Sequence, residues 1–347
     1  MHLRWALLFV GVVLLAAGTA TDDARVWVCL PVVAFLAIPL LDGLLPLDGS
    51  APASPAAARA LRAVPILFAP AHLAVLVWSL VAHAGAPRAT PLEDLAFVFA
   101  AGIAGGIAIN VAHELMHRPT RLERGLAAAL MTSVQYAHFC VEHVHGHHLR
   151  VATPDDPASS RLGEGLWHFL LRTLIGSLRS AWHIETRRGR PFLTHRVAMG
   201  LVAQGALLLL VLGTLGARGA ALYLGQAAVA VLLLETINYI EHYGLTRARR
   251  VRADGREGWE GVTPAHSWNA EHLLAGSLLL QLPRHADHHA HAGRAFAELR
   301  HQPGAPQLPG SYPAMMLLAL VPHLWFRVMD PRVAEHTRAR EGMVPPG

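Results

Sequence analysis

Lysine is absent from this chain of 347 residues, and all 29 of its basic residues are arginines. Charged residues make up only 15% of the sequence and hydrophobic residues 53%, whereas about 25% of a soluble globular protein is charged. This scarcity of charge argues against an ordinary soluble protein and indicates a membrane protein. The formal net charge of +5 is better explained by arginines in cytoplasmic loops than by a nucleic-acid-binding surface.

Cysteine is nearly absent as well. Cys29 and Cys140 are the only two, which excludes a four-cysteine metal site and a disulfide framework. The chain also shows no internal repeat, no flavin-binding motif and no haem-ligand spacing. Histidine, in contrast, is abundant, with 23 residues.

Long apolar runs are the second abundant feature. A helix that crosses about 30 Å of hydrocarbon needs about 20 apolar residues. Six runs of this kind lie at residues 3–20, 26–46, 61–84, 92–112, 197–217 and 219–240. The first could be a signal peptide, but the second follows almost directly, so we interpret both as spans. We therefore expect an all-α polytopic membrane protein in which residues 1–347 form a single domain.

Some apolar segments carry polar residues or are too short to span. Glu235 and Asn238 interrupt the sixth run, and a helix facing lipid would exclude them, so they should face inward. Segments 126–139 and 312–326 are shorter and more polar. We expect them to be interfacial or re-entrant.

The distribution of arginine predicts the topology. Segment 113–195 holds ten arginines and segment 242–347 holds many more, whereas loops 21–25 and 85–91 hold one each. The positive-inside rule then places both termini and both polar segments in the cytoplasm. The prediction is a multi-pass protein of the inner (plasma) membrane with a cytoplasmic cap formed by segments 113–195 and 242–347.

Histidines are strongly clustered in three short stretches. "HELMH" (113–117), "HVHGHH" (143–148) and "HADHH" (285–289) together hold nine of the 23 histidines in 16 positions. Random placement would put about one histidine there. A lone histidine such as His72 is usually structural, but this degree of clustering needs another cause.

Helical geometry suggests that the cause is metal binding. Residues four apart share one face of a helix, and two imidazoles one turn apart can bind one iron, zinc or copper ion. The pairs with this spacing are His113 and His117, His143 and His147, and His285 and His289. His148 and His288 lie beside these pairs. His145 points to roughly the opposite face and is excluded, whereas helical geometry leaves His291 open.

Carboxylates accompany the histidines. An acid that hydrogen-bonds the far ring nitrogen of a ligand fixes its tautomer. The candidates for this role are Glu114, Glu142, Asp287 and Glu241, the last directly before His242 at the end of the sixth run. All of these groups lie at cytoplasmic ends of predicted spans or in cytoplasmic segments, so they can converge. In the nearby turn "TPDDPASS", Asp156 or Ser159 could cap the start of a helix.

Two non-redox alternatives are weaker. "HELMH" also fits the His-Glu-x-x-His pattern of zinc proteases, but a catalytic zinc site needs only three protein ligands. About six clustered histidines would then have no role, and this surplus favours two metals. A metal transporter would need polar residues through the bilayer midplane, whereas the polar groups here gather at one surface.

Four motifs together resemble the integral-membrane alkane monooxygenases, within the wider superfamily of membrane fatty acid desaturases and hydroxylases. The motifs are "HELMHR" (113–118), "EHVHGHHLRVATPDDPASSR" (142–161), "NYIEHYGL" (238–245) and "RHADHHAHAGRAFAELR" (284–300). Their order and spacing match from roughly residue 30 to residue 300. "NYIEHYG" distinguishes the alkane-hydroxylase-like members from general desaturases.

This resemblance implies six transmembrane helices below a cytoplasmic cap that holds two non-haem irons. It implies nine ligands, which are His113, His117, His143, His147, His148, His242, His285, His288 and His289. It thus also excludes His291. It further implies no catalytic side chain separate from the metal ligands.

The implied reaction is hydroxylation of the terminal carbon of an alkane or alkyl chain by dioxygen. The resemblance implies that electrons come from rubredoxin and its reductase. With only Cys29 and Cys140 the chain cannot contain a fused rubredoxin, so the donor should be a separate protein. A related fatty acyl hydroxylase or desaturase is the alternative, and substrate length, regioselectivity and oligomeric state depend on side chains that periodicity does not identify.

The sequence departs from the family pattern at four positions. Arg118 stands where lysine is usual, Pro283 and Ala286 change the usual "LQRHSDHH", and Glu271 replaces a second asparagine in "SWNAEH". None of these changes removes a predicted iron ligand. They affect the surroundings of the metals and the approach to them.

Overall fold

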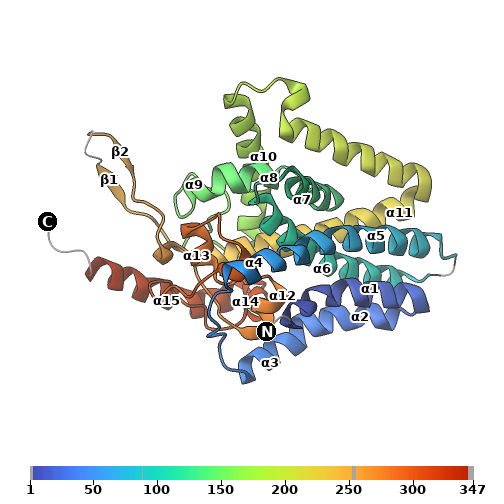
Figure 1. Ribbon diagram of the computed structural model, residues 1–347, viewed down its shortest axis with the longest axis horizontal. Helices are drawn as coiled ribbons and strands as arrows, with labels where there is room; N and C mark the ends of the chain where they lie inside the picture. Colours follow the sequence, from blue (N-terminus) through green and yellow to red (C-terminus); the bar gives the residue numbers. More distant parts are fainter. Residues whose placement is uncertain (1–2, 88, 252–254, 343–347) are drawn as a thin grey trace.

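A computed structural model describes residues 3–87, 89–251 and 255–342. The described chain is mostly helical (Figure 1), as predicted. The strands named among the described residues are short and antiparallel, β1 (Arg249–Val251) and β2 (Glu257–Trp259). Residues 1 and 347, the termini for which a cytoplasmic location is predicted, lie outside the described residues.

The helices follow one another in an order that matches the predicted runs. The N-terminal half contains η1 (Leu3–Phe9), α1 (Val10–Thr21), α2 (Ala24–Val32), η2 (Val33–Ala37), α3 (Ile38–Leu44), α4 (Pro55–Leu61), α5 (Ala63–Gly85), α6 (Pro91–Met116), α7 (Arg121–Ser133), α8 (Phe139–Glu142), η3 (His143–His147) and α9 (His148–Arg150). The C-terminal half contains α10 (Leu166–Arg187), η4 (Phe192–Thr194), α11 (Arg196–His242), η5 (Pro264–His266), α12 (Leu273–Leu278), α13 (His285–Ala290), η6 (Phe296–Glu298), α14 (Tyr312–Ala319) and α15 (Pro322–Gly342).

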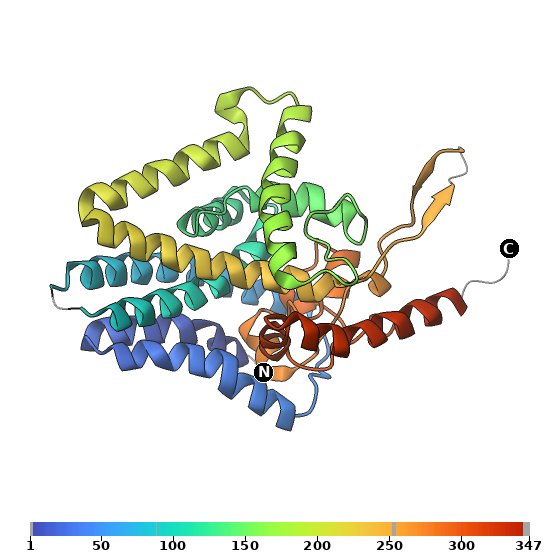
Figure 2. The ribbon, with the colours of Figure 1, turned by 180° about the vertical axis from the view of Figure 1, so that it is seen from behind.

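Five helical segments of the described chain are long and apolar enough to cross a membrane. They are Arg4–Thr21, Ala24–Leu44, Pro55–Gly85, Pro91–Met116 and Arg196–His242. The first four match the first four predicted spans, and the last, α11, covers the fifth and sixth. A break at Gly216, with φ of 67°, turns α11 back into a hairpin of two arms (Figure 2), and glycine adopts such a backbone readily. The number of six crossings stays a prediction.

Helix α6 is the central helix of the bundle. Thr90 and Glu93 form a capping box at its start, and it packs against α1, α2, α5, α7 and α11. Small residues allow α11 to approach closely, since a Cβ atom at Gly102 would lie 2.4 Å from the Val229 side chain. This close crossing brings the ends of α6 and α11 together.

The polar residues of the sixth predicted run face inward, as predicted. Glu235 is buried and its Oε1 accepts a hydrogen bond from Tyr136 Oη at 2.7 Å. Its Oε2 accepts bonds from Thr173 Oγ1 at 2.9 Å and from Asn238 Nδ2 at 3.1 Å. The carboxyl group is thus satisfied by neutral groups from three parts of the chain.

The segment 126–139 forms the end of α7 and a turn that reaches the middle of α11. Gln135 Nε2 donates to Tyr223 Oη at 2.7 Å, and Gln226 Nε2 donates to the Ser133 carbonyl at 3.1 Å. These two bonds tie the turn after α7 to the second arm of α11. Whether the segment is interfacial or re-entrant stays a prediction. Segment 312–326 instead contains α14 and the start of α15, and neither is among the candidate spans.

Helix α10 runs across the direction of the apolar helices in both views (Figures 1 and 2), and it presents three faces. The face toward the protein contains Leu166, Phe169, Thr173, Ser177, Ala181 and Glu185. A second, exposed and apolar flank contains Trp167, Leu171, Leu174, Ile175 and Trp182. A third, exposed and polar flank contains His168, Arg179, His183 and Arg187. This division is typical of a helix that lies at a membrane surface, so the predicted cap segment 113–195 is not uniformly polar.

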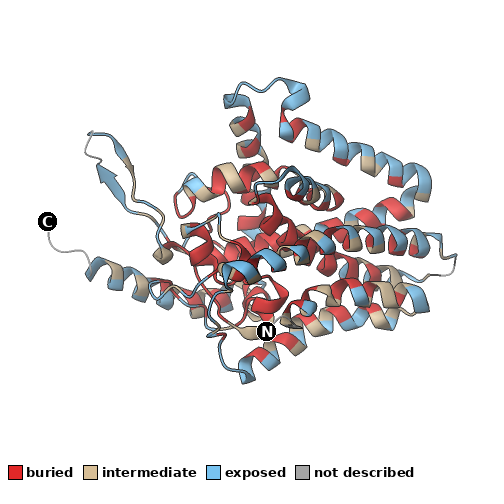
Figure 3. Cartoon of the chain, in the orientation of Figure 1, coloured by how far each residue is buried: buried red, intermediate tan, exposed pale blue. Residues whose placement is uncertain are grey.

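Buried residues gather at one end of the bundle (Figure 3). There the C-terminal ends of α6 and α11 meet η3 and α13. The loops after α1 and α5 lie at the opposite end (Figure 1). The fold therefore collects the histidine motifs at a single place.

Candidate metal centre

Nine imidazoles converge in two groups. Within each group, the nitrogens that could bind a metal ion all lie within 4.8 Å of one another. Site A consists of His113, His117, His143, His148 and His288. Site B consists of His147, His242, His285 and His289. Together these are the nine residues predicted as ligands, and their role in binding iron stays a prediction.

The two sites adjoin because two elements serve both. Site A takes residues from the end of α6, from η3 and α9, and from α13, and site B takes residues from η3, the end of α11 and α13. The rings of His148 in site A and His289 in site B have centroids 4.6 Å apart. The structure thus places two potential metal positions side by side.

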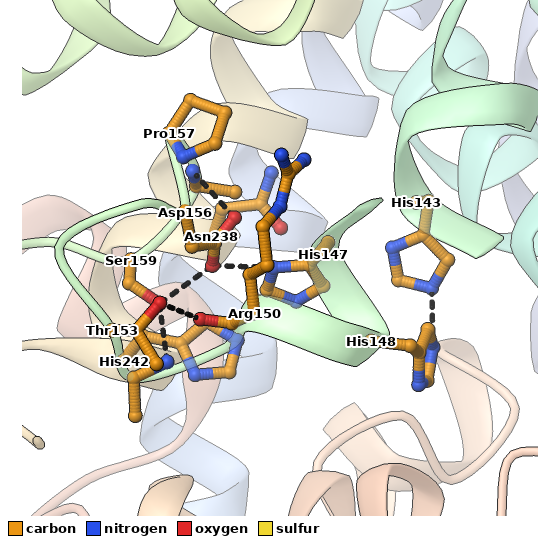
Figure 4. A network of polar contacts seen from close by, with 12 residues as sticks. His143, His147, His148, Arg150, Thr153, Asp156, Pro157, Ser159, Asn238 and His242 are labelled. Atoms are coloured by element: carbon orange, nitrogen blue, oxygen red, sulfur yellow. Dashed lines mark hydrogen bonds and ion pairs between the residues drawn. The ribbon is translucent and has the colours of Figure 1, made fainter. Parts of the chain in front are cut away.

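A π-turn decides how the second motif is divided. His143 and His147 were expected on one helical face and at one ion, but η3 is a π-helix in which the His148 amide donates to the His143 carbonyl. Residues five apart therefore share a face, and His143 Nε2 lies 3.0 Å from His148 Nε2 (Figure 4). The expected pairing is wrong for His143 and His147, which belong to different sites. It is right for the pairs in the first and third motifs.

The distances between ring nitrogens suit shared cations. Nε2 of His285 lies 2.9 Å from Nε2 of His289 and 3.2 Å from Nε2 of His242. In site A, Nε2 of His148 lies 3.1 Å from Nε2 of His288. Nitrogens this close together could bind one cation at the usual metal–imidazole distance of about 2.0–2.1 Å.

Several of these nitrogens have no other partner. Nε2 of His113, His117 and His147 is buried without a hydrogen-bond partner among the described residues. A buried polar atom without a partner destabilises the fold. An ion in site A would satisfy the nitrogens of His113 and His117, and an ion in site B would satisfy that of His147. The donor set therefore fits metal ions.

Burial also keeps the imidazoles in the form that binds metal. Desolvation lowers the pKa of His148, His288 and His289 well below the ordinary 6.5. Burial, with the nearby Arg118 charge, lowers the pKa of His117 to about 3. These rings are neutral at pH 7, and a neutral imidazole has a free lone pair.

Three of the four predicted carboxylate partners bind arginines instead of ligand imidazoles. The pairs are Glu114 and Arg118 at 3.2 Å, Glu142 and Arg150 at 2.7 Å, and Asp287 and Arg294 at 2.5 Å. Each acid lies in a histidine motif and each arginine is close in sequence. These ion pairs hold the motifs in place rather than orient a ring directly.

Asp156, which was expected to cap a helix, is instead the carboxylate partner of the His147 ring. Its Oδ2 lies 2.8 Å from Nδ1 of His147 and accepts a bond from Ser159 Oγ at 2.6 Å (Figure 4). The expectation that Asp156 or Ser159 caps a helix is wrong, because the next helix begins at Leu166 with Gly165 as its N-cap. The sequence feature that could have indicated this contact is the proline-bounded turn around Asp156, nine residues after His147, because the turn folds the chain back onto the histidine motif.

Glu241 occupies a different position from the one expected. Its Oε2 lies 3.1 Å from Nε2 of His285, the nitrogen that faces His242 and His289, and not from the far nitrogen. Tyr312 Oη donates to the other carboxylate oxygen at 2.9 Å. Glu241 therefore lies at the edge of site B and could itself offer an oxygen to a cation there.

The two histidines excluded earlier remain outside both sites. His145 is not part of either group. Nδ1 of His291 lies 3.2 Å from Asp287, and the His291 side chain is 46% exposed. The zinc protease alternative does not fit site A. A protease site has three protein ligands and a free general base, whereas site A has five imidazoles and its Glu114 is paired with Arg118.

A small cavity lies directly against both sites on the side of the bundle. It measures about 20 Å³, room for about one water molecule. His113, His143, His285 and Glu241 line one side of it. Its other walls are mainly apolar and include Ile109, Phe139, Leu234 and Ile237. An apolar chain end in this position would contact both sites.

Arg118 makes several contacts at once through its planar guanidinium group, which lysine lacks. Its Nη1 and Nη2 donate to the carbonyl oxygens of Gly293 and Arg294 at 3.1 and 2.6 Å. A planar guanidinium can make these bonds while it also contacts Glu114. Arg118 thus links the end of α6 to the segment after α13.

The other departures lie behind α13. The Ala286 amide donates to Asn269 Oδ1 at 2.9 Å, and the Pro283 carbonyl accepts a bond from the Ala270 amide at 3.0 Å. Glu271 Oε1 lies 3.4 Å from the amide nitrogen of the Asn269 side chain. These residues support the helix that carries three of the imidazoles.

Comparison with known proteins gives a consistent result. The fatty acid desaturase family matches residues 90–318, about two thirds of the chain. The alkane 1-monooxygenase 2 of Alcanivorax borkumensis is 45% identical over 249 residues, which are 70% of this chain and 64% of that protein. The alkane 1-monooxygenase 2 of Pseudomonas aeruginosa is 39% identical over 93% of this chain and 88% of its own length. The alkane 1-monooxygenase of Acinetobacter baylyi is 39% identical over 88% and 76%.

Proposed function

This chain belongs to the alkane 1-monooxygenase family within the membrane fatty acid desaturases and hydroxylases, and from that premise we propose that it hydroxylates the terminal carbon of alkanes or alkyl chains. One oxygen atom of dioxygen enters the C–H bond, and the other leaves as water after two electrons and two protons are taken up. The observation that carries this proposal is the pair of adjoining imidazole groups at the ends of apolar helices.

The nine imidazoles of sites A and B would hold two iron ions. Iron bound there would supply the activation of dioxygen. The protein's own contribution is to hold the rings neutral and in position. Asp156 fixes the Nδ1 side of His147, and the His266 carbonyl, 3.4 Å from Nδ1 of His242, does the same for a second ligand.

The apolar cavity would position the substrate. Ile109, Leu234 and Ile237 come from α6 and α11, helices that also meet the bilayer. An alkyl chain dissolved in the membrane could therefore approach the metals from the side of the bundle without crossing water. The tight space next to the imidazoles favours a chain terminus over a branched or polar group.

The electron donor would be a separate rubredoxin that docks on a basic groove. A groove of about 390 Å³ follows the polar flank of α10. Its lining includes five arginines, which are Arg150, Arg161, Arg172, Arg179 and Arg187. Asp155 is the one acid among the described residues of that lining. A surface of this charge supports an acidic partner, and Arg150 lies two residues after a ligand of site A.

The proposed topology follows from the same surface. The histidine end of the bundle would face the cytoplasm, where a soluble donor is reduced, and the protein would span the inner membrane. The arginine-rich segments 113–195 and 242–347 support this orientation. A fatty acyl hydroxylase or desaturase remains the second candidate, because the matched family includes desaturases.

One assay separates these candidates. Membranes that contain the protein are given rubredoxin, its reductase, NADH and a ladder of alkanes and fatty acids, and products are identified by mass spectrometry. We expect terminal alcohols from alkanes and none without reductant. Products from fatty acids alone would favour the second candidate, and purified protein with one zinc and no iron would contradict both.

A further inference from the structure

A wide groove separate from the substrate cavity lies between α7, α8 with η3, and the first arm of α11. Its volume is about 870 Å³. The apolar part of its lining includes Ala128, Ala137, Val144, Met199 and Ala203. Its cationic part comprises Arg118, Arg121, Arg124 and Arg196, and the neutral rings of His117 and His145 also line the groove. None of the described residues that line it is an aspartate or glutamate.

The positive charge of this groove is not neutralised from nearby. Arg121 is exposed and has no hydrogen-bond or ion-pair partner among the described residues. Arg124 Nη1 donates only to the backbone carbonyls of Arg118 and Pro119, at 3.2 and 2.6 Å. Glu123, the acid of the same helix, is buried and pairs with an arginine outside the groove. The α7 side of the groove therefore presents two uncompensated guanidinium groups.

The opposite wall has the same excess of positive charge. Arg196 pairs with Glu185 at 3.1 Å, but Glu185 also contacts Arg188 at 3.3 Å and Arg190 at 3.6 Å. One carboxylate thus faces three arginines. An anion between α7 and α11 would be attracted from both sides.

The groove is basic at one end and apolar at the other, which matches the anionic headgroup and the acyl chains of a lipid at a membrane surface. Its arginines lie where apolar helices end or begin, since α6 ends at Met116 and α11 begins at Arg196. Its apolar part continues along α7 and α11 to Thr132 and Ala203, next to the turn that contacts the middle of α11. Basic pockets between membrane helices bind anionic lipid headgroups.

We propose that this groove binds one anionic phospholipid of the surrounding bilayer. Its phosphate lies between Arg121, Arg124 and Arg196, and an acyl chain follows the apolar wall toward Ala203. The proposal does not depend on alkane oxidation. Because His117 of site A is also part of the lining, the bound lipid covers that ligand from water.

Lipid retention tests this proposal without turnover. The full-length protein is placed in nanodiscs of phosphatidylcholine and phosphatidylglycerol in equal amounts, extracted gently, and analysed by native mass spectrometry. We expect one phosphatidylglycerol to be retained in preference to phosphatidylcholine. The double variant Arg121→Gln/Arg124→Gln should retain roughly tenfold less, whereas Arg332→Gln/Arg338→Gln on α15, which removes the same charge elsewhere, should match the unmodified chain.

A second pair of variants tests the acyl-chain part. Ala203→Trp fills the apolar wall and leaves every arginine in place, so it should also lower retention, whereas Ala206→Trp, outside the groove lining, should not. Circular dichroism and bound iron confirm that each variant is folded. Equal retention in all variants would overturn the proposal. So would displacement of the lipid by an equal concentration of inorganic phosphate, or retention of oleic acid in place of the phospholipid.

Discussion

Site A and site B share two of their motifs but differ in exposure and in partners. Site A has five imidazoles, and two of them, His117 and His148, are only partly buried. Site B has four imidazoles, all buried, and carboxylates at two of them, Asp156 at His147 and Glu241 at His285. The comparison teaches that similar histidine spacings do not produce equivalent sites, because the local helix type and the distant partners divide the rings.

The largest expected effect is the loss of one site at a time. His143→Ala removes a site A ligand and His147→Ala a site B ligand. Each should lower bound iron from about two to about one per chain and abolish oxidation, because an incomplete donor set holds the ion poorly. Iron content by elemental analysis and product formation measure this.

His145→Ala is the matched control for both variants. It removes a histidine from the same motif but from neither site, so iron content and activity should be retained. Equal iron loss in His145→Ala and His143→Ala would contradict the assignment of ligands.

A smaller and more selective effect is expected at Asp156. Asp156→Asn removes the charge behind His147, so the affinity of site B for iron should fall by roughly 10–100-fold while site A is unchanged. Chelator titration should then show two separate phases of iron release. Ser159→Ala removes only one hydrogen bond to Asp156 and should have a much weaker effect. A single phase in Asp156→Asn would mean that the sites are not independent.

The next prediction concerns Arg118, which follows the site A ligand His117 directly in the chain. Arg118→Lys keeps the charge but replaces the planar fork, which contacts Glu114 and both the Gly293 and Arg294 carbonyls, with a single compact ammonium. We expect a loss of about 1–2 kcal/mol in the free energy of unfolding, measured by thermal unfolding in detergent, with iron still bound. Arg121→Lys, at an exposed position without a described partner, is the control and should leave stability unchanged. The prediction fails if the two variants are equally stable.

The smallest effect at neutral pH concerns a buried histidine outside both sites. Burial lowers the pKa of His138 from 6.5 to about 4. Between these pH values the unfolded chain binds a proton that the folded chain does not, so stability falls as pH decreases through 6.5 toward 4, by up to roughly 1.4 kcal/mol per pH unit. His138→Phe should remove this contribution. Unfolding curves of both proteins from pH 7.5 to 5 that stay parallel would refute it.

Much of the architecture was predictable from local sequence patterns. Apolar runs of the length of a bilayer predicted the long helices, and a polar pair within a run, Glu235 and Asn238, predicted its inward face. Histidines four apart predicted the pairs in "HELMH" and "HADHH". These features depend on residues close in sequence and on regular helical geometry, which a pattern can express.

Other features were not predictable in the same way. The division of His143 from His147 depends on a π-turn, and a pattern based on regular helices assigns the wrong face. Asp156 reaches His147 because a loop folds back, and Glu241 reaches His285 because α11 meets α13. The residues in such contacts are not spaced by the repeat of a helix, so a sequence pattern based on that repeat cannot predict the contacts.

The sequence by itself determined that this is a helical membrane protein with a histidine-rich centre at one end, because hydrophobic length and helical spacing are local properties of a chain. Only the tertiary structure decided which imidazole belongs to which site, which carboxylates support them, and that a basic groove opens beside site A. The physical reason is that a metal site and a groove are defined by atoms within a few ångströms in space, and the close crossing of α6 and α11 sets those distances.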